Sequence, residues 1–441
     1  MRRALLVTGS VLLALVPSLA AAQPSPAEAS PAGASTGVAA PPIRYKTFLA
    51  ELHKGNLELA AQRANIPIAE AQIAVAKVFP DPALTAGVGA LDVTGKGSPT
   101  ATTLGLGVTL ELGGKRGARV AVATSDVGQV RAELDDFLRG LRANATESFI
   151  EGLYARLVLD RKRQTLRSLE KLVTVNEDRL RAGDVGKVAL AQSRVEAQRF
   201  RGEVLSAEAN VAAADLGLAV YLGAGGGGGP QRVAAAGDLK LKPRTFDVEG
   251  LIAEARANRP DLASKRRAVE GASARVDLAH ANRWVDVTLN VGWAHSFAGA
   301  RGTDFAQPPY DALSGTVTVP LPFSKAYRGE LNAALATRVQ SRTTVAAAEL
   351  RIDVEVRQAA ARYKASVDKL GLYTGGLMTD AEQVLDATLY NYQRGGATLL
   401  EVLVAQRTVN EVYLSYYDAM AEHARALVAL EQAVGIWDLD F

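Results

Sequence analysis

Apolar side chains recur at alternating spacings of three and four residues over very long stretches of this chain. No proline interrupts residues 115–181, which contain one such stretch. Its apolar positions are Val127, Val130, Leu134, Phe137 and Leu141, followed by Leu166, Leu169, Val173 and Leu180. A repeat near 3.5 residues predicts helices that wind around one another. At a rise of 1.5 Å per residue, this stretch predicts a helix roughly 100 Å long.

This long pattern ends at a turn, after which a second helix is predicted. Residues 181–186 read Arg-Ala-Gly-Asp-Val-Gly and interrupt the pattern. Gly183 is well placed to end the first helix, because glycine readily adopts the left-handed conformation found there. The helical pattern resumes over residues 187–222. The two stretches therefore predict an antiparallel helical hairpin.

The same design returns in the second half of the chain. Residues 325–394 form another uninterrupted helical pattern, with seam positions at Tyr363, Val367, Leu370, Leu377 and Val384. This pattern stops at Gly395 and Gly396, and residues 397 to about 434 predict the returning helix. Two hairpins of similar length indicate a duplicated unit.

Strict alternation of apolar with small or polar residues marks a different kind of segment. It is clearest at residues 104–112, 285–293 and 313–321, and weaker at residues 84–90. Each segment predicts a strand of about 9–11 residues, the length that crosses a bilayer when tilted. Loops at residues 94–99 and 297–309 join the strands in pairs. The aromatic residues near the strand ends are Trp284, Trp293, Tyr310 and Phe323, as expected at membrane interfaces.

The remaining segments complete the order of elements. Residues 45–78 predict a helix that ends before Pro80, and residues 246–258 and 261–282 predict two helices in the second half. The predicted organisation is a signal peptide (1–22), a Pro- and Ala-rich linker (23–42), a first repeat (43–222), a Gly-rich linker (223–245), a second repeat (246–436) and a C-terminal tail (437–441).

Composition narrows the cellular location and the class of function. Arg2 and Arg3, the apolar residues 5–19 and the alanines at 20–22 are typical of a secretory signal. No later stretch approaches the ~20 apolar residues of a membrane-spanning helix, so none is predicted. The absence of cysteine excludes disulfides and thiolate metal sites. A net charge of +3 over 441 residues gives no support for nucleic-acid binding.

Strands of membrane length impose a requirement on assembly. An open sheet in lipid would leave edge N–H and C=O groups unpaired, at several kcal/mol each. Two copies would give about 8 strands and a filled barrel, whereas three would give about 12 and a water-filled lumen. The inward positions carry Gly, Thr and Ser with Asp286 and Glu111, which suit a wet lumen. We therefore predict a mainly α-helical fold with a small transmembrane β component, whose homotrimer forms a β-barrel of about 12 strands continued by an α-helical barrel.

Several short motifs follow this order of elements. They are Pro80-Asp-Pro82, the junction Glu111-Leu-Gly-Gly-Lys-Arg116, and the tips Arg181-Ala-Gly183 and Tyr392-Gln-Arg-Gly395 with Glu401-Val-Leu403. With them, nearly the whole mature chain resembles the outer membrane efflux protein (TolC) family, and Lys115-Arg116 is most similar to its heavy-metal (CzcC- and CusC-like) branch. The resemblance implies an exit duct in outer-membrane lipid, fed by an inner-membrane RND-type or ABC pump through a periplasmic adaptor (membrane fusion) protein.

The resemblance also implies that the hairpin tips dock the adaptor. The residues it assigns to docking are Arg181, Gly183, Asp184, Val185, Gly395, Gly396 and Leu399. The alternative interpretation is that the glycines are ordinary helix stops, because glycine ends helices in many folds.

A second role implied by the resemblance is closure of the periplasmic end. Tyr392 matches the family's gate tyrosine, and Glu401 lies where an acidic ring narrows the lumen and would favour cations. The alternative for Glu401 is a solvated helix charge. The chain departs from the family pattern at Val404, Ala397 and Ala189, which replace residues that are often charged. A weaker or differently built gate is therefore expected.

No catalytic or metal-binding set emerges from the sequence. His53, His280, His295 and His423 are far apart, and the glycine run at 223–229 lacks the Lys-Ser/Thr pair of a phosphate loop. We therefore predict no enzymatic activity, cofactor or metal site. A periplasmic adaptor or coiled-coil scaffold and a soluble periplasmic enzyme are the rival classes, although neither explains the four strands. Within the duct interpretation, the cargo could be metal ions, drugs or secreted polypeptide.

Overall fold

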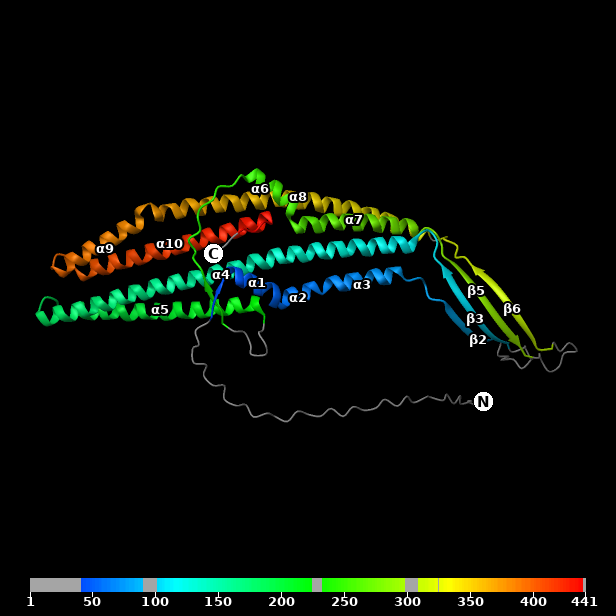
Figure 1. The fold of residues 1–441 in the computed structure, drawn as a ribbon, viewed down its shortest axis with the longest axis horizontal. Coiled ribbons are helices and arrows are strands. Elements are labelled where there is room, and N and C mark those ends of the chain that lie inside the picture. The colour runs from blue at the N-terminus through cyan, green and yellow to red at the C-terminus, as the bar shows by residue number, and fades with distance from the viewer. Residues whose placement is uncertain (1–40, 90–100, 224–231, 298–307, 324, 439–441) are drawn as a thin grey trace, which may run out of the picture. The chain divides into compact units, whose positions relative to one another are not determined.

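The computed structural model describes residues 41–89, 101–223, 232–297, 308–323 and 325–438. The predicted signal peptide, nearly all of the linker at 23–42, the loop at 94–99 and most of the loop at 297–309 lie outside these residues. Most of the glycine run at 223–229 lies outside them as well. The described elements between residue 41 and residue 438 are shown as a ribbon in Figure 1.

The first long hairpin matches the predicted bounds closely. Helix α4 (Lys115–Ala182) is 68 residues long, and helix α5 (Lys187–Leu222) returns along it. Their seam buries Leu169 of α4 against Phe200 and Val204 of α5. Gly183 ends α4 with a φ of +85°, which glycine adopts without strain. By length and composition α5 would qualify as a membrane-spanning helix, which the sequence analysis did not foresee, but one face of α5 is packed against α4.

The second long hairpin contains a break that the sequence analysis missed. Helix α8 (Ala326–Leu372) and helix α9 (Met378–Gln393) are separated by a π-helical turn at Tyr373–Leu377, and helix α10 (Leu399–Val434) returns beside them. Within this turn Gly376 has a φ of +125°. The prediction of an uninterrupted helix over residues 325–394 is therefore wrong. Figure 1 shows the bend between α8 and α9.

The break changes which side chains are buried. Tyr363, before the turn, is 4% exposed, whereas Leu377 is 44% and Val384 is 58% exposed. The prediction of one continuous seam through these residues is therefore wrong. The cause is geometric, because a wider turn and a non-helical residue rotate the following helix relative to the preceding one.

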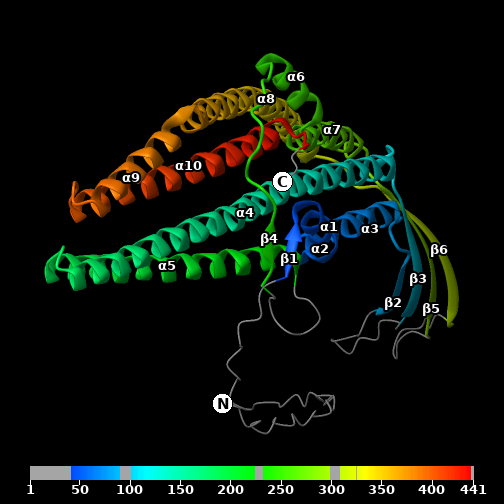
Figure 2. The same ribbon diagram turned by 60° about the vertical axis from the view of Figure 1, so that its left-hand side comes forward.

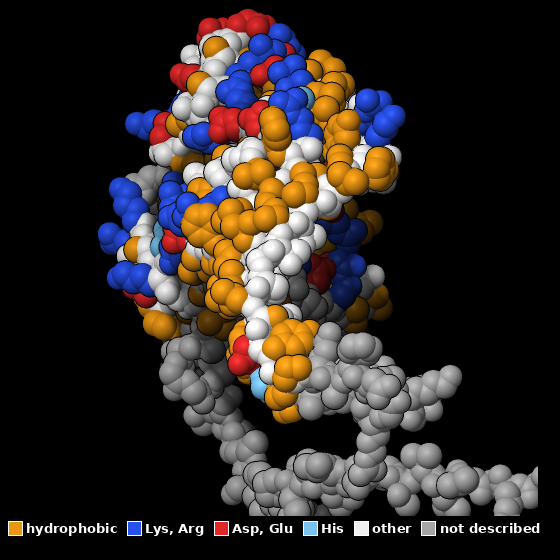
Figure 3. Space-filling view, turned by 90° about the vertical axis from the view of Figure 1, so that its right-hand side faces the viewer, with side chains coloured by type: hydrophobic (Ala, Val, Ile, Leu, Met, Phe, Trp, Pro, Cys, Tyr) orange, Lys and Arg blue, Asp and Glu red, His pale blue; other side chains and the backbone are white. Residues whose placement is uncertain are grey.

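Four strands form one antiparallel sheet in the order β2-β3-β5-β6. They are β2 (Ala83–Gly89), β3 (Ala101–Leu110), β5 (Val287–Ser296) and β6 (Tyr310–Thr318). The register aligns Leu106 with Leu84 on one side and with Val291 on the other, which places the apolar residues on one face. Figure 3 shows hydrophobic side chains gathered along the strands. Within the described chain the outer edges of β2 and β6 pair with no other strand.

The shorter helices differ between the two halves. The predicted helix at 45–78 is divided into α1 (Tyr45–Gly55), α2 (Leu57–Arg63) and α3 (Asn65–Lys77), so its continuity was predicted wrongly. Helices α6 (Val248–Asn258) and α7 (Pro260–Ala281) match the prediction within two residues. A small parallel sheet of β1 (Pro42–Arg44) and β4 (Ala234–Ala236) was not predicted. It brings the start of the first repeat beside the segment between the repeats (Figure 2).

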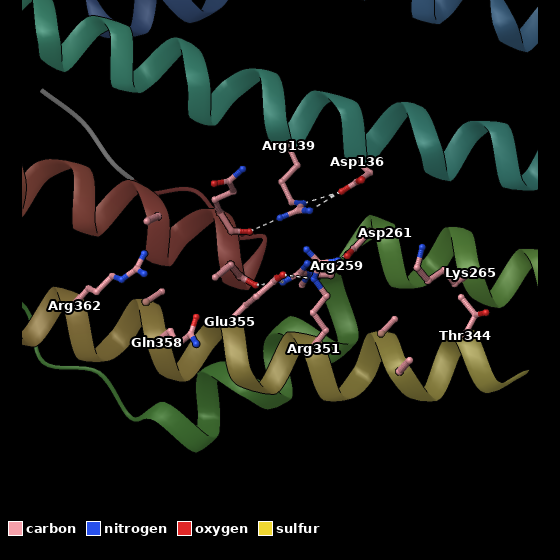
Figure 4. A pocket seen from close by; sticks show the side chains of 16 residues that line it. Asp136, Arg139, Arg259, Asp261, Lys265, Thr344, Arg351, Glu355, Gln358 and Arg362 are labelled. Carbon is pink, nitrogen blue, oxygen red and sulfur yellow. Dashed lines mark hydrogen bonds and ion pairs between the residues drawn. The ribbon is translucent and has the colours of Figure 1, made fainter. Parts of the chain in front are cut away.

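In each half, a buried polar residue joins the end of the returning helix to the start of a shorter one. Asn56 accepts a hydrogen bond from the Leu59 backbone at the start of α2 and donates one to the carbonyl of Tyr221 in α5. Arg259 precedes α7 and donates to Asp261, Glu355 and the carbonyl of Ala433 in α10. Figure 4 shows this second joint within a cavity of 680 Å³ between α4, α7, α8 and α10. These side chains supply partners to backbone groups that a helix end leaves unpaired.

A buried acid near the end of α10 holds the C-terminal segment. Glu431 is 7% exposed, and its Oε1 accepts a hydrogen bond of 3.3 Å from the backbone of Asp438. Asp438 forms an ion pair of 2.6 Å with Arg244, and the Arg142 guanidinium lies 4.8 Å from the Trp437 ring centroid. Burial, aided by the neighbouring Asp438 carboxylate, raises the pKa of Glu431 to about 8.

This pKa predicts that stability falls as pH rises. The folded state binds a proton at Glu431 that the unfolded chain loses near the ordinary pKa of 4.5, so the benefit is complete below that value and disappears as pH approaches about 8. The loss is up to about 1.4 kcal/mol per pH unit within this window. Glu431→Gln, which is always neutral, should show a flatter dependence of the unfolding midpoint between pH 5 and pH 8. The exposed Glu411→Gln is the control, and an unchanged slope in Glu431→Gln would contradict the assignment.

Candidate functional site

The candidate site consists of the two hairpin tips. At the α4–α5 tip, Arg181 forms an ion pair of 2.5 Å with Asp178, and the backbone of Asp184 donates to the carbonyl of Arg179 over 2.8 Å. At the α9–α10 tip, Gly395 has a φ of +81°, and the backbone of Gly396 donates to the carbonyl of Asn391 over 2.9 Å. The exposed residues of these turns include Arg181, Gly183, Asp184, Gly395, Gly396 and Leu400, whereas Val185 is half-buried.

Tyr392 connects the two tips. Its ring is 3% exposed, and its hydroxyl donates a hydrogen bond to Oδ1 of the fully buried Asn176 in α4. Arg179, one turn further along α4, donates to the carbonyl of Tyr392 over 2.8 Å and lies 4.7 Å from the ring centroid. A single side chain of the second hairpin is thus held by a hydrogen bond and a cation–π contact from the first.

An apolar cluster surrounds this contact. Leu172 of α4 packs with Tyr392, Leu399 and Val402, and all four side chains are buried. Leu399, one of the residues that the resemblance assigns to docking, is therefore enclosed within the chain.

Glu401 lies on the exposed side of α10 and has a local partner. Its Oε2 accepts a hydrogen bond from the Thr398 backbone over 2.6 Å, and its own backbone N–H donates to the Thr398 hydroxyl over 3.3 Å, which completes a capping box. The hydrogen bond from the Thr398 backbone lowers the pKa of Glu401. Glu401 also lines an open groove of 350 Å³ between α9 and α10, together with Val384, Leu400 and Val404. Within one chain, therefore, Tyr392 and Glu401 occupy different environments.

The sequence analysis missed Asn176 and Arg179. A signal for Asn176 was present, because it lies between Val173 and Leu180 at a seam position of the heptad pattern. A polar residue at such a position is costly unless a specific partner reaches it, so it marks a specific contact. Arg179 carried no comparable signal.

Among the residues that the structure describes, no three His, Asp or Glu side chains lie close enough together to hold a metal ion. His423 is buried in α10 beside Ser366 and Tyr363, and burial lowers its pKa. Its surroundings are those of a packed core residue.

Comparison with known proteins decides the family. The model of the family described as "Outer membrane efflux protein" matches residues 49–224 and 251–436. The chain belongs to this family. It is 25% identical over 435 residues to the cobalt-zinc-cadmium resistance protein CzcC of Cupriavidus metallidurans, covering 99% of this chain and 100% of that protein. It is 28% identical over 336 residues to the pyoverdine export outer membrane protein OpmQ of Pseudomonas putida, covering 73% of this chain and 67% of that protein.

A solved structure supports the same fold. The crystal structure of CusC superposes with a TM-score of 0.71 at 18% identity, covering 89% of this chain and 92% of CusC. The protein is thus an outer-membrane efflux channel with a long periplasmic helical part. Like the channels of its family, it acts as a homotrimer with a periplasmic adaptor and an inner-membrane pump. The unpaired edges of β2 and β6 are where neighbouring subunits of the trimer complete the barrel.

Proposed function

We propose that this efflux channel exports heavy-metal cations. The observation that carries the proposal is the full-length similarity to CzcC, which is named for cobalt, zinc and cadmium resistance and aligns over 99% of this chain. The fold similarity to CusC extends over 89% of the chain. The junction motif at Lys115-Arg116 is the sequence feature that favours the same branch.

The polar face of the sheet suits small hydrated cargo. Opposite the apolar face, the strands carry hydroxyl, amide and glycine positions, which are Thr85, Gly105, Thr109, Thr288, Asn290, Gly292, Ser314 and Thr316. Several hydroxyls are bonded within the sheet, as between Thr109 and Thr288 over 3.2 Å. The hydroxyl and amide groups of this surface can hydrogen-bond to the water around an ion. They are not arranged as a set of ligands that would bind the ion itself, so ions can pass without being held.

The cargo is tested by sensitivity of a strain that lacks the gene. We expect growth to be impaired by cobalt, zinc or cadmium salts and restored by the intact gene, with little change towards organic antibiotics. The similarity to OpmQ, a pyoverdine exporter, favours a chelating organic cargo as the second candidate. Equal tolerance to every metal, together with loss of export of an organic compound, would replace the first candidate by the second.

We further propose that the tips carry the two roles assigned by resemblance. The adaptor would dock on the turn residues Arg181, Gly183, Asp184 and Val185 of one tip and Gly395 and Gly396 of the other. Tyr392 would act as the closing element, because releasing it from Asn176 and Arg179 is required before the two hairpins can separate at their ends. Glu401 would face the lumen from the groove side of α10.

Tyr392→Phe tests the closing role. The variant keeps the ring and the Arg179 contact but leaves the buried Asn176 without its hydrogen bond, at a cost of about 1–3 kcal/mol per subunit. The open population should therefore rise about fivefold or more, seen as more frequent high-conductance openings in planar bilayers. Tyr390→Phe is the control, because Tyr390 is 51% exposed and its ring lies 4.0 Å from the guanidinium of Arg394 on the same tip. Identical traces for Tyr392→Phe and the intact channel would argue against closure by this contact.

Glu401→Gln separates charge from capping. Glutamine can still complete the capping box, so α10 should start normally while the negative charge is lost. We expect a reduced preference for cations over anions, measured as a shift of the reversal potential in a salt gradient. Thr398→Ala removes the cap and keeps the charge, so it should leave the reversal potential unchanged. A cation preference that survives Glu401→Gln would place this carboxylate away from the constriction.

A further inference from the structure

Exposed aromatic side chains gather where the strands meet the helices. Phe79 lies between α3 and β2, Trp284 between α7 and β5, and Phe323 between β6 and α8. Their exposed fractions are 62%, 52% and 84%. Phe323 continues the alternating row of Val319 and Leu321, which prolongs the apolar face of β6 towards the helices. These aromatic residues therefore mark the periplasmic limit of the apolar band.

Cationic side chains lie beside these rings. The Arg116 guanidinium is 4.5 Å from the Phe79 ring centroid, and that of Arg283 is 5.5 Å from the Trp284 ring. Arg328 lies 5.9 Å from the Tyr327 ring, one turn into α8. With the exposed Lys77 and Lys325 they form a set that we call the basic belt, defined as Lys77, Arg116, Arg283, Lys325 and Arg328.

Other cations at this level are paired with acids. Lys115 is paired with Asp286 over 2.8 Å, and Arg119 is paired with Glu111. Among the described residues, no member of the basic belt forms such an ion pair. Arg116 instead donates to the carbonyl of Lys77 over 2.7 Å, which holds its guanidinium at the surface. The unpaired acids nearby are Asp81 and Glu330, so a net positive charge remains.

We propose that the basic belt binds the phosphate groups of anionic phospholipids in the periplasmic leaflet of the outer membrane. Guanidinium groups donate two parallel hydrogen bonds to a phosphate, and the adjacent aromatic rings insert among the upper acyl chains. The belt lies at the depth of the headgroups, because it directly follows the apolar face on the side of the long helices. Three subunits repeat it around the barrel. The proposal depends on the membrane location of the family and not on the nature of the cargo.

The test compares lipid retention by trimers extracted from nanodiscs of phosphatidylethanolamine mixed with phosphatidylglycerol. Native mass spectrometry counts the phosphatidylglycerol molecules that remain on each trimer. In the triple variant Arg283→Gln, Lys325→Gln and Arg328→Gln, the affinity that underlies this retention should fall roughly a hundredfold, since each of the three surface cations contributes about fivefold. In nanodiscs of phosphatidylethanolamine alone, the variant and the intact trimer should have the same unfolding midpoint.

The matched control removes three exposed cations far along the helices, as Arg201→Gln, Arg342→Gln and Lys364→Gln. Unchanged retention in the belt variant, or an equal loss in this control, would overturn the proposal. Displacement of phosphatidylglycerol by inorganic phosphate would also overturn it, because the belt would then be a site for the free anion. If the triple variant does not assemble, Arg283→Gln and Arg283→Lys give the same comparison, with retention lost in the first and kept in the second.

Discussion

The need to pair every backbone polar group inside hydrocarbon governs this molecule. One chain contributes a sheet of four strands whose two outer edges have no partner within the described residues. In lipid, each unpaired N–H or C=O costs several kcal/mol, so the edges of β2 and β6 must meet those of other copies. The trimer follows from this requirement, and so does the position of the helices. Since α4 and α8 begin where β3 and β6 end, a ring of strands imposes a ring of helices below it.

A second requirement arises where helices of different length are combined. Helix α7 packs against α4 and α8, and α10 packs against the same two helices. The start of α7 is joined to the end of α10 through Arg259. Each of these ends exposes backbone groups that no turn of its own helix can satisfy. Arg259 supplies a donor at the end of α10, and Asn56 supplies one at the end of α5. The two side chains share no chemistry beyond hydrogen bonding. The duplication has therefore kept the position of the joint and changed its residue.

The elements that were predicted correctly are those specified by a local repeat. The seam of α4 and α5 and the alternation in β3, β5 and β6 are periodic, so the residues fix both the element and its buried face. The breaks at Asn56 and Gly376 were missed, because each is a single residue whose effect depends on what it meets in space. The β1–β4 pairing joins short segments that have no repeat. For the candidate site, the turns could be found from glycine, whereas the partners of Tyr392 come from another hairpin and required the fold.

The π-helical turn at Tyr373–Leu377 separates α8 from α9, so the apolar stripes of the two helices face different directions. Before the turn, Tyr363 of α8 is buried within its own chain. After the turn, Val384 of α9 is exposed. Without such a turn, the heptad pattern would place both apolar stripes on one face of a single helix, and one partner helix would have to cover the whole length of that face. With the phase shifted, Tyr363 packs inside its own chain while Val384 lines the open groove between α9 and α10. A single local irregularity thus ends the buried stripe of α8 and leaves an exposed apolar stripe at the start of α9.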